Sequence, residues 1–204
     1  HKKALKDYRA ALDVFMQFAG RSKAARSQEP ALIRLNMASL LSDEERTVQA
    51  SVLLRKSCVA FRHLLQKSRT PQAQGFLATA LTQFADCQTQ LGCLRQAKSS
   101  IREALELLDE LVRINGFCDF EHILILARSN QCKISLALGD FEEALGQADT
   151  LIACIRKAML GGRTDIEAFM PFTCSTRAEI LIGMGRSAEA IEAVRPVMMA
   201  MGKS

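Results

Sequence analysis

Four polar residues recur along this chain at nearly equal intervals. Asn36 and Gln83 are 47 residues apart, Asn130 follows after another 47, and Thr176 after a further 46. Three carboxamides and one hydroxyl at a repeated position would form a row of hydrogen-bond donors and acceptors. Such a row can bond the main chain of an extended peptide without requiring particular side chains. The alternative is that polar residues simply tolerate an exposed position.

A second row lies three residues further along each interval. Its members differ in charge, which favours selectivity for side chains over a uniform anion site. They are Ser39, Asp86, Lys133 and Glu179. Four large apolar residues accompany these rows, and they could line pockets beside them or pack beneath a neighbouring helix: Leu32, Leu35, Leu126 and Phe172.

Candidates for catalysis are weak. None of the three histidines is paired with a metal-ligand residue in a recognised arrangement at helical spacing, and Glu121-His122 is more typical of a surface pair than of an acid–base couple. No cysteine has the adjacent base that a nucleophile needs. The loop at Gly161-Gly162 lacks the Lys-Ser/Thr ending of a phosphate loop. We therefore expect a protein that is not an enzyme, with no catalytic residues, metal site or cofactor.

Composition restricts the class of protein further. The chain has 204 residues, 49% of them apolar, and a net charge of +5 from 27 Lys and Arg against 22 Asp and Glu. No apolar run approaches the roughly 18 residues of a membrane span. Seven cysteines without a Cys-x-x-Cys pair favour reduced thiols and an intracellular location, cytoplasmic or nuclear.

The charge is uneven along the chain. Residues 1–70 hold 14 basic and 6 acidic groups, whereas residues 71–204 hold 13 basic and 16 acidic groups. A basic first third could attract an acidic protein, a nucleic acid or a membrane surface. Its charges are dispersed and are not regularly interleaved with aromatic residues for base stacking, so a solvated helix face is the better interpretation.

The elements that must position these residues are helices. Apolar residues recur at helical spacing in long segments, and no segment alternates with the two-residue period of a strand. Breaks fall near Pro30, Pro71, Asn115-Gly116, Gly161-Gly162 and Gly185. The pattern predicts an all-α chain with a leading helix at about 3–18 and four helix pairs, at about 31–42 with 46–67, 73–91 with 94–115, 120–138 with 141–159, and 166–183 with 187–200.

Small residues mark the same position in each pair. Ala97, Ala144 and Ala190 each follow a glycine by five residues, and Ala50 occupies the corresponding place after Glu45. A second small residue precedes each of these turns by seven positions: Ala38, Ala85, Cys132 and Ala178. Small side chains let two helices approach closely, and stacked pairs bury the apolar face that one pair cannot cover alone.

This pattern resembles the tetratricopeptide repeat. Gly139-Asp140-Phe141-Glu142-Glu143-Ala144 is the closest match to the family's turn, and the resemblance covers four units plus a leading second helix. The period of 46–47 residues exceeds the usual 34, Glu45 replaces one turn glycine, and Pro196 should end or kink the last helix. The resemblance implies a right-handed α-solenoid of antiparallel helix pairs, one domain over residues 1–204 with repeats at about 31–67, 73–115, 120–159 and 166–200. Because the chain opens on an unpartnered helix, we expect it to be a fragment of a longer protein.

The resemblance also implies a function. Asparagine at the position of Asn36 and Asn130 resembles the backbone-binding ladder of long-repeat adaptors, so the two polar rows are the expected partner-binding site. The expected role is a noncatalytic interaction scaffold that holds a partner peptide or helix in a concave groove, while neighbouring repeats of the same chain supply further contacts. A peptide-sensing regulatory domain that controls an attached output domain is the alternative. A nucleic-acid-binding solenoid fits less well, because base-reading side chains are missing.

Overall fold

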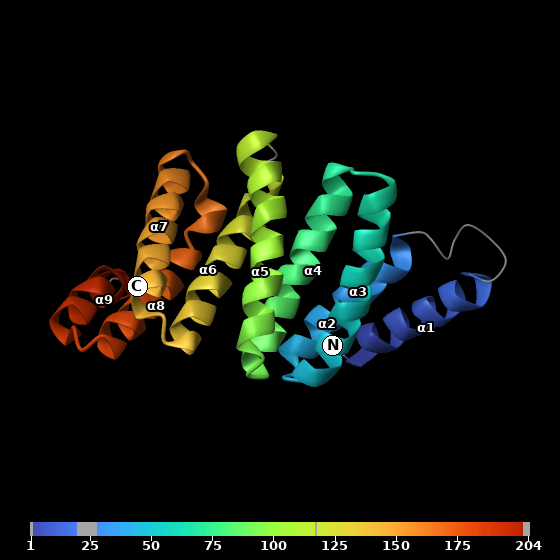
Figure 1. The fold of residues 1–204 in the computed structure, drawn as a ribbon, viewed down its shortest axis with the longest axis horizontal. Coiled ribbons are helices and arrows are strands. Elements are labelled where there is room, and N and C mark those ends of the chain that lie inside the picture. Colours follow the sequence, from blue (N-terminus) through green and yellow to red (C-terminus); the bar gives the residue numbers. More distant parts are fainter. Residues whose placement is uncertain (1, 20–27, 117, 202–204) are drawn as a thin grey trace. The chain divides into compact units, whose positions relative to one another are not determined.

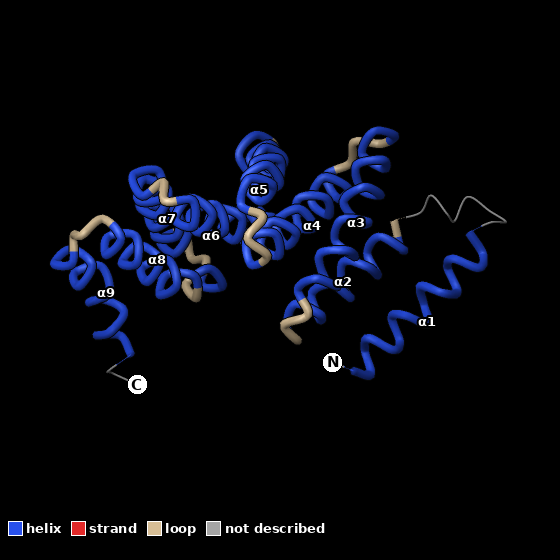
Figure 2. The backbone as a smooth tube through the Cα atoms, turned by 60° about the horizontal axis from the view of Figure 1, so that its bottom comes forward, coloured by secondary structure: helices blue, strands red, loops and turns tan. Residues whose placement is uncertain are grey.

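The structure, a computed structural model, describes residues 2–19, 28–116 and 118–201. Within these ranges every regular element is a helix and none is a strand, so the predicted all-α class is confirmed (Figure 2). The chain divides into two compact units, His1–Phe120 and Glu121–Ser204, and we describe each by itself. The single continuous domain expected from the repeats stays a prediction.

The first unit contains the leading helix and two helix pairs. Helix α1 spans Lys2–Ala19 and contacts α2 (Glu29–Asp43), and α2 packs against α3 (Thr47–Lys67). Helix α4 (Pro71–Gln90) packs against both α3 and α5 (Leu94–Asp109), as Figure 1 shows. The predicted helix at 94–115 is interrupted: α5 gives way to a π-helical turn at Glu110–Ile114, which is followed by a 3-10 turn at Cys118–Phe120.

The second unit repeats this order. Helix α6 (Glu121–Leu138) packs against α7 (Phe141–Leu160), α7 against α8 (Phe169–Gly183), and α8 against α9 (Ser187–Met201). A 3-10 turn at Thr164–Ile166 joins α7 to α8, and α6 also contacts α8. Helix α9 continues through Pro196, so this proline does not end the helix, and the alternative expectation of a kink there stays a prediction.

The turn inside each helix pair has one backbone geometry. The glycines at 92, 139 and 185 have φ values of 73°, 80° and 75°, in the left-handed region that favours glycine. Glu45, in the corresponding turn of the first pair, has a φ of 58°. In that turn the Arg46 amide donates to the Leu41 carbonyl at 2.8 Å, the bond that closes a Schellman cap. The predicted equivalence of the four turns is therefore confirmed, including the one without glycine.

The small residues lie at the contacts between helices, as predicted. Those in the first helix of each pair are all buried, and so are the four alanines that follow the turns: Ala38, Ala85, Cys132, Ala178, Ala50, Ala97, Ala144 and Ala190. In the second unit, Cys132 and Ala144 share one core cluster with Ala148 and Ile180. A larger side chain at these places would push the helices apart.

Two glycines within helices make room for an aromatic ring. A Cβ atom on Gly75 of α4 would lie 2.1 Å from Cε1 of Phe120, and one on Gly183 of α8 would lie 2.4 Å from Cε1 of Phe141. These distances are far below van der Waals contact, so each ring packs directly on a helix backbone. Through Gly75, the 3-10 turn at Cys118–Phe120 is anchored to α4.

Candidate functional site

In the first unit, the two predicted polar rows lie on α2 and α4. Asn36 is exposed, while Ser39, Gln83 and Asp86 are half-buried. The Ser39 hydroxyl lies 3.1 Å from Gln83 Oε1, to which it can donate, and 3.3 Å from the carbonyl of Leu35 in its own helix. The structure therefore brings one member of each row together across the α2–α4 contact.

Asp86 is held by a chain of side-chain hydrogen bonds. Gln90 donates from Nε2 to Asp86 Oδ2 at 2.8 Å, and its Oε1 accepts from the Thr47 hydroxyl of α3, also at 2.8 Å. Sequence reasoning missed Thr47 and Gln90, although Gln90 stands four residues after Asp86, the spacing of neighbours on a helix surface. These two hydrogen bonds hold the carboxylate of Asp86 in place at the edge of the polar surface.

In the second unit, the residues of the first row are more buried than side chains that bind a peptide main chain need to be. Asn130 of α6 is 5% exposed and Thr176 of α8 is 6% exposed. The Thr176 hydroxyl donates to the carbonyl of Phe172 at 3.1 Å, so its proton is used within its own helix. The backbone-binding role of these two residues stays a prediction, and they offer a peptide much less surface than Asn36 does.

The second row of this unit makes a contact between helices. Lys133 Nζ of α6 lies 4.4 Å from the centre of the Phe172 ring of α8, within the range of a cation–π interaction. Phe172 is 55% exposed, and Glu179, two turns further along α8, is also exposed. The two expected roles of Phe172 were to line an apolar pocket or to pack beneath a neighbouring helix; its ring instead is more than half exposed and lies beneath the Lys133 cation.

These contacts have the same form in both units. In each, the second-row residue of one first helix contacts the first helix of the next pair: Ser39 with Gln83 in one unit, and Lys133 with Phe172 in the other. The structure thus assembles a short polar surface within each unit. The row of four running through both units stays a prediction.

A further polar hollow of about 260 Å³ opens on the second unit between α6 and α7. Gln147 donates from Nε2 to Glu143 Oε1 at 3.0 Å, and Thr150 donates to the Gly146 carbonyl at 2.8 Å. Its lining residues are Arg128, Gln131, Glu143, Gly146, Gln147 and Thr150. The hollow therefore offers hydrogen-bonding groups, which are distinct from both predicted rows.

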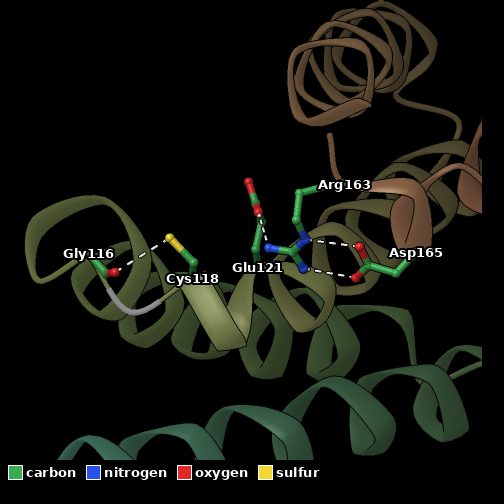
Figure 3. A network of polar contacts seen from close by, with 5 residues as sticks. All are labelled: Gly116, Cys118, Glu121, Arg163 and Asp165. Carbon is green, nitrogen blue, oxygen red and sulfur yellow. Dashed lines mark hydrogen bonds and ion pairs between the residues drawn. The ribbon is translucent and has the colours of Figure 1, made fainter. Parts of the chain in front are cut away.

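Glu121, one of the candidates weighed for catalysis, takes part in a network of ion pairs with the turn before α8. Arg163 donates to Glu121 at 2.8 Å and to both carboxylate oxygens of Asp165 at 2.9 and 2.8 Å, which ties α6 to the turn before α8 (Figure 3). The hydrogen bonds from Arg163 lower the pKa of Asp165 below its usual value. In the first unit, Cys118 Sγ lies 3.5 Å from the carbonyl of Gly116 (Figure 3). These are the contacts of turns that join helices.

The buried thiols are poorly suited to nucleophilic chemistry. Burial raises the pKa of Cys58 to about 12, and it does the same to Cys132. Burial also raises the pKa values of Cys87 and Cys174. A thiol must ionise to attack, so burial disfavours the reactive form of all four groups.

Over residues 2–19, 28–116 and 118–201, no group of three His, Cys, Asp or Glu side chains could hold a metal ion. In that same part of the chain, none of the helices has the length and apolar character needed to cross a membrane.

Comparison with known proteins gives no indication of this chain's function. No protein-family model matches this chain, and a search of curated proteins finds no relative of it. Evidence for a function therefore comes from the chemistry of the side chains on α2 and α4 and on α6 and α8.

Proposed function

We propose that this chain is a noncatalytic interaction module that binds an extended peptide or a helix of a partner protein along the first helices of its helix pairs. The observation that carries the proposal is the polar surface of α2 and α4, where exposed Asn36 lies on the same helix as Ser39, which bonds Gln83. Carboxamides supply both donors and acceptors, and a peptide main chain presents both.

The fold that we propose with it is a tetratricopeptide-like, right-handed superhelix of antiparallel pairs. Equal turn geometry at Glu45, Gly92, Gly139 and Gly185 supports a repeated pair, and so does the burial of small residues at matching positions. In such an arrangement the first helices would line one concave face. The contacts between α2 and α4, and between α6 and α8, are the local form that this face would take.

Side-chain preference would differ between the two units. The α2–α4 surface offers amides, a hydroxyl and the anchored Asp86 carboxylate, whereas the α6–α8 surface offers Lys133, Phe172 and Glu179. An aromatic ring with a cation above it suits a peptide residue that has an apolar stem and an acidic end. The proposal therefore includes main-chain binding at α2–α4 and side-chain selection at α6–α8.

The test is affinity capture with two sets of substitutions in the whole chain. Asn36→Ala with Gln83→Ala should remove a captured partner while the helical signal and melting temperature stay unchanged. Gln66→Ala with Gln96→Ala removes two exposed carboxamides from α3 and α5 and should leave capture intact. The captured protein is then divided into synthetic peptides, whose direct binding is measured by calorimetry with both variants.

Retention of every partner by the Asn36/Gln83 variant would refute the assignment of the surface. Equal loss from both variants would also refute it, because a general loss of surface amides would then explain the result. We choose the pair in the first unit because Asn130 is nearly buried, and its replacement would confound binding with stability.

A further inference from the structure

The outer face of α3 carries three exposed valines that the repeat does not explain. Val48 is 62% exposed, Val52 is 41% exposed and Val59 is 60% exposed. At about 100° per residue, these three side chains point within about 40° of one another around the helix. They form one stripe, which we call the α3 valine stripe.

Comparison with α5 and α7 shows that these two helices lack the stripe. Stepping by 47 residues from each valine reaches positions that are also exposed on α5 and α7. Those positions hold polar, charged or small residues: Arg95, Ser99 and Glu106 on α5, and Glu142, Gly146 and Ala153 on α7. Since solvent-facing positions of the scaffold need no valine, packing inside the repeat does not account for the stripe.

The charged side chains of α3 itself are all basic. Residues 47–67 contain four Lys or Arg, one His and no Asp or Glu. Arg55, Lys56 and His63 are exposed beside the valines. Arg62 is held toward α5 by two hydrogen bonds to Glu103, at 2.7 and 2.6 Å, which fixes one edge of the basic border.

The spacing of the stripe identifies the shape of its partner. The steps from Val48 to Val52, Arg55, Val59 and Arg62 are 4, 3, 4 and 3 residues, the seam spacing of two helices packed side by side. Three valines and two arginines stand along this seam. A complementary helix would therefore place aliphatic residues along the seam and carboxylates at its flanks, beside Arg55 and Lys56.

We propose that the α3 valine stripe docks an acidic amphipathic helix of a partner protein. A membrane surface fits less well, because the large hydrophobic side chains that are exposed on α3 are valines alone, without the Trp, Phe or Leu anchors of helices that lie in a bilayer. This surface is on α3, whereas the peptide surface proposed above is on the first helices, so the two proposals stand or fall separately.

The test uses a synthetic probe. A fluorescent 21-residue helical peptide carries Leu at its seam positions and Glu at the flanking positions, and a second peptide carries Lys in place of Glu. Anisotropy titrations with the full chain should show binding of the acidic peptide and none of the basic one. Val52→Ser with Val59→Ser should weaken binding about tenfold, and Arg55→Glu with Lys56→Glu should weaken it by at least as much.

Two controls separate the seam from general attraction. Ile114→Ser removes an apolar side chain that is 77% exposed in the first unit but lies outside α3, and it should leave binding unchanged. Amide-exchange protection on peptide binding should concentrate in residues 47–67. Circular dichroism confirms that each variant is folded, and Val59→Ser alone replaces the double variant if that one is not.

Three outcomes would overturn the proposal. Equal binding of the acidic peptide by wild type and the valine variants would show that charge alone accounts for the interaction. Failure of the acidic peptide to bind would show that the α3 valine stripe does not dock an acidic amphipathic helix. Valine-dependent sedimentation with vesicles of phosphatidylcholine and phosphatidylserine, in the absence of peptide binding, would assign the stripe to a membrane instead.

Discussion

The first helix pair, α2 with α3, and the third, α6 with α7, share a scaffold and differ in surface. Ala38 and Ala50 of the first pair and Cys132 and Ala144 of the third lie at the same buried contacts. On the outer face, however, Val48, Val52 and Val59 correspond to Glu142, Gly146 and Ala153. Helix contacts restrict side-chain volume, whereas solvent does not, so binding properties can diverge on the outside while the pair is preserved.

Substitutions that change the volume of a buried side chain test this comparison with the largest expected effect on stability. Leu54 of α3 is fully buried, and Ala148 lies at the corresponding position of α7, also fully buried. Leu54→Ala should lower the free energy of unfolding by about 2–5 kcal/mol, because the cavity left behind cannot collapse completely. Ala148→Leu should lower it by about 1–3 kcal/mol through overpacking. Urea unfolding followed by circular dichroism measures both.

The matched outer control is Val59→Ala. It should change the free energy of unfolding by less than about 0.5 kcal/mol, since the side chain is 60% exposed. A loss as large as that of Leu54→Ala would mean that the valine stripe is structural, which would weaken its assignment as a docking surface.

The turns provide the next largest contrast. Glu45 has a positive φ in the first pair, where the third pair has Gly139. Glu45→Gly should raise the free energy of unfolding by about 1 kcal/mol, because the left-handed conformation costs about 1–2 kcal/mol with a Cβ atom and glycine recovers part of it. Gly139→Ala should lower it by about 1 kcal/mol for the same reason. Destabilisation by Glu45→Gly would show that the Glu45 side chain itself holds the turn.

The cysteines are expected to show the smallest effect on stability at neutral pH. Their reactivity with a thiol reagent distinguishes buried from exposed positions. Cys58 and Cys132 are buried, whereas Cys93 and Cys118 are exposed. At pH 8 a thiol reagent such as Ellman's should label Cys93 and Cys118 rapidly and leave Cys58 and Cys132 unmodified until the chain unfolds. Single Cys→Ser variants assign each reaction, and fast labelling of Cys58 would contradict its burial.

The same thiols give a pH dependence with a defined sign. Burial raises the pKa of Cys58 and Cys132 from 9.0 to about 12, so the folded state retains protons that the unfolded state releases. Their contribution to stability is fully present below pH 9.0 and is lost as the pH rises from 9.0 to about 12. Cys58→Ala should reduce this alkaline loss, as measured by unfolding at pH 7 and pH 10.

Most of the helix boundaries could be predicted, because the signals that set them are local. Pro71 follows Thr70, whose hydroxyl accepts from the Ala73 amide at 3.2 Å, and this cap begins α4 close to the predicted residue. The helical stretch that starts with α5 also ends where predicted, at Asn115 with Gly116 in the left-handed region, but its last turn is π-helical. The π-helical turn at Glu110–Ile114 follows no local signal, and it stands where Phe120 packs on Gly75 of another helix.

The candidate site was only partly predictable. Its residues could be found by counting, since a repeated fold puts equivalent residues at equal intervals. Their exposure could not: Asn36 is open to solvent, whereas Asn130 at the same position is buried. The contact between Lys133 and Phe172 joins residues 39 positions apart on different helices, and no local pattern specifies it.

The sequence by itself determined the helices, their turns and the small residues at their contacts, because each follows from the periodicity and backbone preferences of a short segment. Only the tertiary structure decided which polar residues reach solvent, that Ser39 lies against Gln83, and that Val48, Val52 and Val59 stay uncovered. Exposure depends on the rotation and separation of neighbouring helices. Those quantities are set by the packing of residues that are far apart in the chain.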